Sequence, residues 1–260
     1  MRLDALLAQR GLFETRTRAA ASVLAGEVRI GTAGERATKP GTLVAQDVEL
    51  SVDETPRFVS RGGIKLANAL AESDLDPSGR LCLDVGASTG GFTDCLLQAG
   101  AAGVTALDVA YGELSWRLRG DPRVTVIERF NARELHGGAL PYAPDLIVAD
   151  VSFISLRLLL GPMLACAAPR FDALLLVKPQ FEAGRDAVGR GGVVRDGALR
   201  RQAMVDVAHA ASALGASVRG FFASGLPGPK GNIETFLCLA EGSRGGATDL
   251  EALALAADPG

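Results

Sequence analysis

Short apolar runs alternate with helical stretches over most of the chain beyond residue 80. The runs of strand length are Leu81–Val85, Val104–Val109, Val124–Ile127, Leu146–Ala149, Ala173–Val177, Val218–Phe222 and Ile233–Ala240. Stretches with helical character separate several of them, at Phe92–Gln98, Leu156–Ala168 and Arg200–Leu214. Buried strands that alternate with helices are typical of a parallel sheet with helices on both faces. We therefore predict an α/β fold with a Rossmann-like, mostly parallel sheet.

The last two apolar runs form an exception to this alternation. They are joined only by Ala223–Asn232, which is too short for a crossover helix. Parallel neighbours need a crossover of a dozen or more residues, whereas antiparallel strands accept a short connection. The last strand should therefore be antiparallel to its neighbour.

The first 55 residues follow a different pattern. The leucines within residues 3–7 share one face of a short helix, and Thr15 can cap a second helix that ends before Gly26. Short strands are expected at Val28–Ile30 and Val48–Val52. This pattern predicts a small α+β domain.

Proline and glycine positions mark the boundaries between the parts. We expect a small domain at residues 1–55, a linker at 56–61, a large domain at 62–242 and a glycine- and alanine-rich tail at 243–260. The tail is expected to be partly disordered, with a short helix at Asp249–Ala257.

Composition limits the classes of protein. The chain is 48% hydrophobic and 22% charged, with no apolar run long enough to cross a membrane and no secretory pattern at its start, so we expect a cytoplasmic protein. We also expect it to be a monomer in solution. Four cysteines without close spacing and two histidines argue against a metal site. The net charge is −3, but residues 1–65 carry ten Lys/Arg and eight Asp/Glu, a slight local excess that permits binding to a polyanion.

A glycine-rich loop follows the first predicted strand of the large domain. It runs from Asp84 through Gly86, Ala87, Ser88 and Thr89 to Gly90 and Gly91. Glycines let the backbone approach a ligand closely, as they do in nucleotide-binding loops. A carboxylate at position 84 would repel a pyrophosphate but suits the ammonium of an amino-acid tail. The loop therefore favours S-adenosylmethionine over NAD, although it could also be a simple tight turn.

Two further polar residues follow neighbouring strands. Asp108 ends the second strand, where a carboxylate can accept hydrogen bonds from a ribose diol. Asn131 follows the third strand and could bond the edge of an adenine. Either residue could instead cap a turn.

Lysines and acids are predicted to converge at the same edge of the sheet. Asp150 and Lys178 end the fourth and fifth strands, Glu234 lies early in the last strand, and Lys65 lies on the helix before the sheet. Ligands of open α/β sheets bind outside the carboxyl ends of the strands. Two buried ammonium groups disfavour each other's charge, so one lysine could accept a proton from a hydroxyl. Two separate structural ion pairs are the alternative.

These residues resemble a known family. Lys65, Asp150, Lys178 and Glu234 resemble the Lys-Asp-Lys-Glu tetrad of FtsJ-like ribose 2′-O-methyltransferases. The small domain resembles the RNA-binding domain named after the fourth ribosomal protein of the small subunit, through Arg2–Asp4, Arg10–Leu12, Thr15–Arg16 and Lys39–Gly41. Together with Ser60–Leu66, Gly86–Thr93, Asp150–Ser155, Val177–Glu182 and Pro227–Asn232, the ordered set is similar to the TlyA family over nearly the whole chain.

The resemblance implies methylation of a cytidine ribose in ribosomal RNA or ribosomal subunits, with S-adenosylmethionine as the donor. It implies that Lys178 is the base, that Lys65 and Glu234 orient the hydroxyl and tune Lys178, and that Asp150 faces the methyl donor and the lysines. Some members of this family carry the name haemolysin.

Basic and aromatic residues are the candidates for contact with RNA. In the small domain these are Arg2, Arg10, Arg16, Arg18 and Lys39, and beside the predicted cleft they are Arg61, Arg129 and Lys230. Phe153 could stack on a base extruded from the RNA or replace it in the stack, or it could belong to the core.

Two other functions fit parts of the sequence. One is a non-catalytic RNA-binding protein with a degenerate methyltransferase fold, and the other is a nucleotide-dependent dehydrogenase. The tetrad and the glycine loop weigh against the first, and the carboxylate of Asp84 in that loop favours S-adenosylmethionine over the NAD that the second would need.

Overall fold

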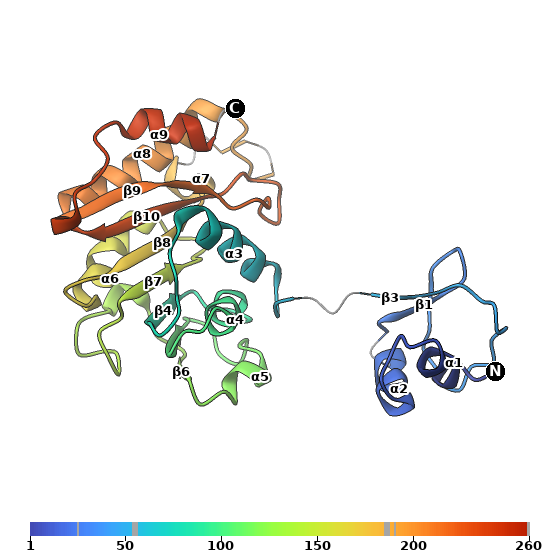
Figure 1. Ribbon diagram of the computed structural model, residues 1–260. Helices are drawn as coiled ribbons and strands as arrows, with labels where there is room; N and C mark the ends of the chain where they lie inside the picture. Colours follow the sequence, from blue (N-terminus) through green and yellow to red (C-terminus); the bar gives the residue numbers. More distant parts are fainter. Residues whose placement is uncertain (25, 54–56, 185–187, 190, 259–260) are drawn as a thin grey trace. The chain divides into compact units, whose positions relative to one another are not determined.

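The chain divides into two units, residues 1–56 and 57–260, which are described separately (Figure 1). The computed structural model describes residues 1–24, 26–53, 57–184, 188–189 and 191–258. Of the predicted linker 56–61, Pro56 lies outside the described residues, and Arg61 already begins a helix.

The small unit packs two helices against a three-stranded antiparallel sheet. Its elements are α1 (Leu3–Gln9), α2 (Arg16–Leu24), β1 (Val28–Ile30), β2 (Glu35–Arg36) and β3 (Leu50–Val52), with the strand order β2-β1-β3 in the described residues. Leu3, Leu7, Ala19, Val23 and Val28 form its core. The Thr15 hydroxyl accepts a hydrogen bond from the Arg18 amide at 3.2 Å, so the predicted cap of the second helix is confirmed.

The large unit is built on a seven-stranded sheet. Within the described residues the strand order is β6-β5-β4-β7-β8-β10-β9. The strands are β4 (Leu81–Val85), β5 (Gly103–Leu107), β6 (Val124–Ile127), β7 (Leu146–Ala149), β8 (Asp172–Val177), β9 (Ala216–Ala223) and β10 (Thr235–Glu241). Strands β4 to β8 pair in parallel, and β10 pairs antiparallel with both β8 and β9. The α/β class, the mostly parallel sheet and the antiparallel last strand are confirmed.

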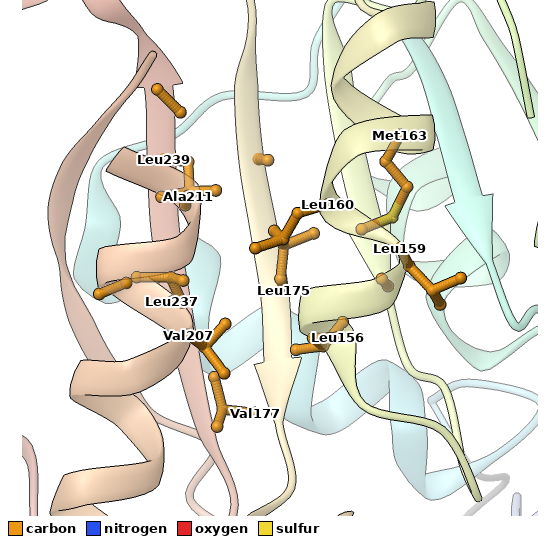
Figure 2. Close-up of a cluster of buried hydrophobic side chains, with 14 of the residues drawn as sticks. Leu156, Leu159, Leu160, Met163, Leu175, Val177, Val207, Ala211, Leu237 and Leu239 are labelled. Carbon is orange, nitrogen blue, oxygen red and sulfur yellow. The ribbon is translucent and has the colours of Figure 1, made fainter. Parts of the chain in front are cut away.

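Helices cover both faces of this sheet because successive side chains of a buried strand point to opposite sides. The helical segments are α3 (Arg61–Ser73), α4 (Gly91–Gln98), α5 (Trp116–Arg119), η1 (Ala132–Glu134), η2 (Leu156–Leu158), α6 (Leu160–Cys166), α7 (Pro179–Glu182), α8 (Gly197–Ala213), η4 (Gly242–Arg244) and α9 (Leu250–Ala257). Leu174 and Leu176 of β8 face the core shared with α3 and α4, whereas Leu175 and Val177 face the core beneath α6 and α8. Figure 2 shows this second core, with Leu175 and Val177 near the strand and Leu160 and Val207 on the helices to either side of it.

The tail differs from the expectation of partial disorder. Residues 250–257 form α9, as the short helix predicted there, and its Leu250 and Ala254 are buried against the core beneath α8. Just past α9, Asp258 pairs with the buried Arg200 of α8 at 2.6 Å. The apolar side of α9 and this ion pair bind the segment to the sheet unit; residues 259–260 lie outside the described residues.

The four cysteines are free and buried, as expected of small apolar side chains in a core. Among the described residues, no group of three or more His, Cys, Asp or Glu side chains is arranged to hold a metal ion. No helix in the described ranges is both long enough and apolar enough to span a membrane.

Candidate active site and cofactor cleft

The sheet brings three of the four tetrad residues to one edge. Asp150 directly follows β7 and Lys178 directly follows β8. Because β10 runs antiparallel to β8, its first residue, Thr235, pairs with the last residue of β8, Val177. One position beyond this pair come Glu234 and Lys178, so the two are neighbours across the strands.

Lys178 holds its ammonium between two acceptors. Its Nζ lies 2.6 Å from Asp150 Oδ1 and donates a hydrogen bond of 2.8 Å to Ser152 Oγ. The residue is 9% exposed, and both partners follow the end of β7. These contacts fix the ammonium, and Lys178 also lines a cavity with Asp150 and Ser152. Ser152 was missed as a site residue, although it stands only two positions after Asp150 in a motif that the sequence analysis singled out.

Lys65 and Glu234 form a second pair, which is more deeply buried. Lys65, on the inner face of α3, makes a hydrogen-bonded ion pair with Glu234 Oε2, and the two residues are 7% and 2% exposed. Among the described residues, the other carboxylate oxygen, Glu234 Oε1, has no hydrogen-bond partner. Gly228 packs so closely on it that a β-carbon there would collide with Oε1.

The glycine loop forms the floor of the cleft beside Asp150. Gly86 has φ +82°, and a β-carbon on it would lie 2.6 Å from the Asp150 carbonyl oxygen. This close approach requires glycine. A cavity of about 200 Å³ is lined by Gly86, Ala87, Ser88, Gly91, Asp150, Ser152 and Lys178, among others. A second cavity of about 450 Å³ shares Gly86, Ser88, Asp150 and Ser152 and continues past Asp108 and Asn131.

Asp84 lies beneath this loop as a buried acid. Its Oδ2 accepts a hydrogen bond of 2.7 Å from the Thr93 hydroxyl, whereas Oδ1 has no partner among the described residues. Complete burial raises the pKa of Asp84 to about 7, against the lowering effect of the Thr93 hydrogen bond and with a smaller contribution from the negative charge of Asp150. A buried carboxylate oxygen without a donor is suited to receive a cationic group.

Asp108 and Asn131 line the larger cavity but also bind the backbone. The two oxygens of Asp108 accept hydrogen bonds from the amides of Ser88 at 2.7 Å and Ala110 at 2.8 Å. Asn131 caps η1 by accepting from the Arg133 amide at 3.1 Å. The capping interpretation therefore holds for both side chains, and their contacts with a cofactor stay predictions.

Phe153 is not part of the core. The residue is 92% exposed and adopts the left-handed conformation, with φ +65°. Its ring centroid lies 5.4 Å from that of Phe181, beside a groove of about 470 Å³ that Ile154, Ser155 and Gln180 also line.

Several of the basic residues of the small unit have partners within the protein. Arg2 and Arg16 both pair with Asp4, at 2.9 and 3.2 Å, and Arg10 donates to the carbonyl oxygens of Gln46 and Val48. The hydrogen bond from Arg2 is the main cause that lowers the pKa of the Asp4 carboxyl to about 2. These arginines thus have structural contacts that the sequence analysis did not foresee. Arg18 and Lys39 are exposed.

The three basic residues that were predicted beside the cleft have exposed side chains. Arg61, at the start of α3, donates to the Pro227 carbonyl oxygen at 3.1 Å. Arg129 has φ +56°, and its guanidinium lies 4.2 Å from the centre of the Tyr111 ring. Lys230 lies in the loop that also contains Gly228, next to Glu234.

Comparison with known proteins identifies the family. Residues 58–241 match the FtsJ-like methyltransferase family, and residues 1–50 match the S4 domain. A Mycobacterium tuberculosis protein named 16S/23S rRNA (cytidine-2′-O)-methyltransferase TlyA is 50% identical over 92% of this chain and 89% of its own length. The chain belongs to the TlyA family. The alternative of a nucleotide-dependent dehydrogenase is therefore wrong.

Other relatives of the TlyA family extend the comparison. A Campylobacter jejuni protein named 23S rRNA (cytidine-2′-O)-methyltransferase TlyA is 36% identical over 69% of this chain and 69% of its own length. A solved structure from Streptococcus thermophilus, with hemolysin in its name, is 39% identical, covers 99% of this chain and 95% of its own, and has a TM-score of 0.75.

The cleft fits S-adenosylmethionine, the cofactor expected for an FtsJ-like fold. The orphaned Oδ1 of Asp84, fully buried beneath the glycine loop, suits the ammonium of its amino-acid tail, and Gly86, which has no side chain, lets the loop lie directly against Asp150. The two connected cavities give room for an extended ligand from Lys178 to Asn131.

Proposed function

We propose that this chain transfers a methyl group from S-adenosylmethionine to the 2′-hydroxyl of a cytidine in ribosomal RNA. The observation that carries the proposal is the placement of Lys178 Nζ, which Asp150 and Ser152 hold in the wall of the cavity. The names of the relatives support the reaction and the nucleoside, and the S4 domain supports RNA as the partner.

Lys178 acts as the general base. In its neutral form, Nζ accepts the proton of the ribose hydroxyl, and the Asp150 carboxylate 2.6 Å away stabilises the ammonium that forms. When bound, the cofactor supplies a methyl group on a positively charged sulfur, which is a good leaving group. The protein then needs only to hold the hydroxyl oxygen in line with that methyl group.

Lys65 and Glu234 position the hydroxyl. Their mutual ion pair neutralises both charges in a buried place, while Glu234 Oε1 retains the capacity to accept a further hydrogen bond. We propose that the cofactor is bound by the buried acid, the glycine loop and the ends of the neighbouring strands, through Asp84, Gly86, Ala87, Ser88, Gly90, Gly91, Asp108, Asn131 and Asp150. Of these, Gly90 packs against Leu114 and Leu118 and lines neither cavity.

Phe153 stacks on the extruded target base or takes its place in the RNA stack. A ribose hydroxyl inside a helix is hard to align with a methyl donor, so the nucleotide has to leave the stack. The ring is 92% exposed and borders an open groove, which supports this role. The exposed Arg18, Lys39, Arg61, Arg129 and Lys230 bind phosphates, and Arg2, Arg10 and Arg16 combine phosphate contacts with their structural ones.

The test is to map 2′-O-methyl positions in ribosomal RNA. Purified small and large subunits, and free RNA, are incubated with S-adenosylmethionine with and without the protein. We expect a new 2′-O-methylcytidine in at least one of the substrates. A protein that binds RNA tightly but adds no methyl group to any of them would instead be the non-catalytic RNA-binding protein. Because the substrate would be the ribosome, we place the protein in the cytoplasm.

A further inference from the structure

The loop after β7 holds an aromatic residue in an unfavourable backbone conformation. Phe153 has φ +65°, a region that bulky residues rarely adopt, and its ring is almost fully exposed. An exposed ring gains little from burial in return for that conformation. Such residues persist only where the surrounding contacts determine the backbone, and they concentrate at functional sites.

Those contacts come from one buried acid, Glu182, at the end of α7. Its Oε1 accepts the backbone amide of Leu156 at 2.7 Å, and its Oε2 accepts the Ser155 hydroxyl at 2.5 Å. Arg157 adds a guanidinium 3.4 Å from Oε2 and donates to the Glu182 carbonyl oxygen at 3.1 Å. The Glu182 side chain is only 1% exposed. Both carboxylate oxygens are therefore committed to the segment that follows Phe153.

Glu182 also belongs to the segment that follows the proposed base. Helix α7 begins at Pro179, immediately after Lys178. The loop after β7 is thus tied to the segment after β8 twice: Ser152 accepts from Lys178, and Ser155 and Leu156 donate to Glu182. Phe153 lies between the two ties. Removing Glu182 would release one end of the turn and leave the other attached.

We propose that Glu182 is a positioning residue that holds the 152–155 turn so that Phe153 projects beside Lys178 toward the RNA. This inference rests on the proposed function and deepens it. A residue that only stabilises the fold would affect every substrate alike, whereas a residue that positions Phe153 should matter most when the target nucleotide is stacked.

The experiment compares two RNAs that share the target sequence, one a stable hairpin and one unable to pair. We expect Glu182→Ala to lower kcat on the hairpin by roughly 10- to 100-fold, since small misplacements of a positioning group cost that much. On the unpaired RNA the loss should be at most about twofold, with unchanged affinity for S-adenosylmethionine. Glu182→Gln should recover most of the activity, because its amide oxygen can accept from Leu156 and its NH₂ can donate to Ser155.

The matched control is Asp172→Asn, at the opposite end of β8. Asp172 is likewise buried and accepts from two arginines, Arg80 at 2.7 Å and Arg244 at 2.5 Å. This variant should change the two RNA rates by the same factor. If Glu182→Ala does not fold, Ser155→Ala serves in its place, because it removes one of the two hydrogen-bond donors to Glu182. It should also lower the rate more on the hairpin than on the unpaired RNA, by a smaller factor.

A double variant isolates the ring. In a Phe153→Gly background, Glu182→Ala should no longer change the ratio of the two rates. The inference is overturned if Glu182→Ala lowers the rates on both RNAs by the same factor, as the control does. It is also overturned if Glu182→Ala changes the ratio of the two rates as much in the Phe153→Gly background as in the wild-type protein. If the wild-type protein methylates neither of these RNAs nor either ribosomal subunit, the proposed function fails. Amide hydrogen exchange then tests whether Glu182 holds the turn. Faster exchange in Glu182→Ala over residues 152–156, but not over 160–166, supports the inference. Unchanged exchange over residues 152–156 overturns it.

Discussion

Two lysine–carboxylate pairs stand at the same edge of the sheet, but they differ in their access to the cleft. In the pair of Lys65 and Glu234, the side chains are 8% and 1% exposed. In the pair of Lys178 and Asp150 they are 11% and 26% exposed, and Lys178 has Ser152 as a second partner. The first pair is closed, and the second opens onto the cavity beside the glycine loop. The open pair is therefore suited to proton transfer, and the closed pair is suited to a rigid positioning role that also stabilises the fold.

The largest expected effect comes from a substitution that breaks the open pair of Lys178 and Asp150. Lys178→Met should lower kcat by roughly 10²- to 10⁴-fold, the usual contribution of a general base. Stability should change by roughly 1 kcal/mol or less, because the carboxylate left behind faces water. The measurements are transfer of labelled methyl and calorimetric binding of S-adenosylmethionine. A variant that keeps its rate would remove Lys178 from the mechanism.

Breaking the closed pair should lower stability as well as activity. Lys65→Met leaves Glu234 buried without its cation, which should cost about 3–5 kcal/mol of unfolding free energy. Urea denaturation measures the loss. A second change, Glu234→Leu, should restore much of the stability but not the activity. Similar unfolding curves for Lys65→Met and Lys178→Met would contradict the distinction between the two pairs.

Asp84 differs from both pairs, because it is a buried acid without a cationic partner within the described residues. Because its pKa is raised to about 7 in the free protein, the carboxyl becomes neutral as the pH falls below 7. A cationic ligand favours the ionised form, so affinity for S-adenosylmethionine should fall roughly tenfold from pH 8 to pH 6. The same raised pKa makes this group's contribution to stability largest at acidic pH and lost as pH rises toward 7.

Calorimetric titration across this pH range tests the prediction, with Asp84→Asn as the control. That variant should bind more weakly and lose the pH dependence. An equally steep dependence in Asp84→Asn would assign the titration to another group.

The smallest expected effect comes from removing Ser152, the second hydrogen-bond partner of Lys178. Ser152→Ala deletes one hydrogen bond to Lys178, worth about 1 kcal/mol, so kcat should fall by roughly threefold to tenfold with little change in stability. Steady-state kinetics on the mapped RNA site measures it. A loss as large as that of Lys178→Met would instead place the Ser152 hydroxyl in the proton transfer itself.

The sheet, its antiparallel last strand and the places of the tetrad were predictable because they depend on local patterns. Apolar runs mark buried strands, and polar residues at their carboxyl ends lie at the ligand-binding edge of such a sheet. Which side chains pair with one another was harder to predict from the sequence. The sequence did not indicate that Arg2 and Arg16 share Asp4, that Asp108 accepts two backbone amides, or that Asp258 ties the tail to α8.

The amino-acid sequence by itself determined which residues carry charge, where glycine permits close approach, and which strand or helix each tetrad residue accompanies. Only the tertiary structure decided that Lys65 is sealed against Glu234 while Lys178 stays at a cavity, and that Glu182 holds the turn of Phe153. The reason is that periodicity and turn chemistry act over a few residues. Burial and hydrogen-bond partners, in contrast, arise from strand register between segments more than twenty residues apart, where small shifts exchange one partner for another.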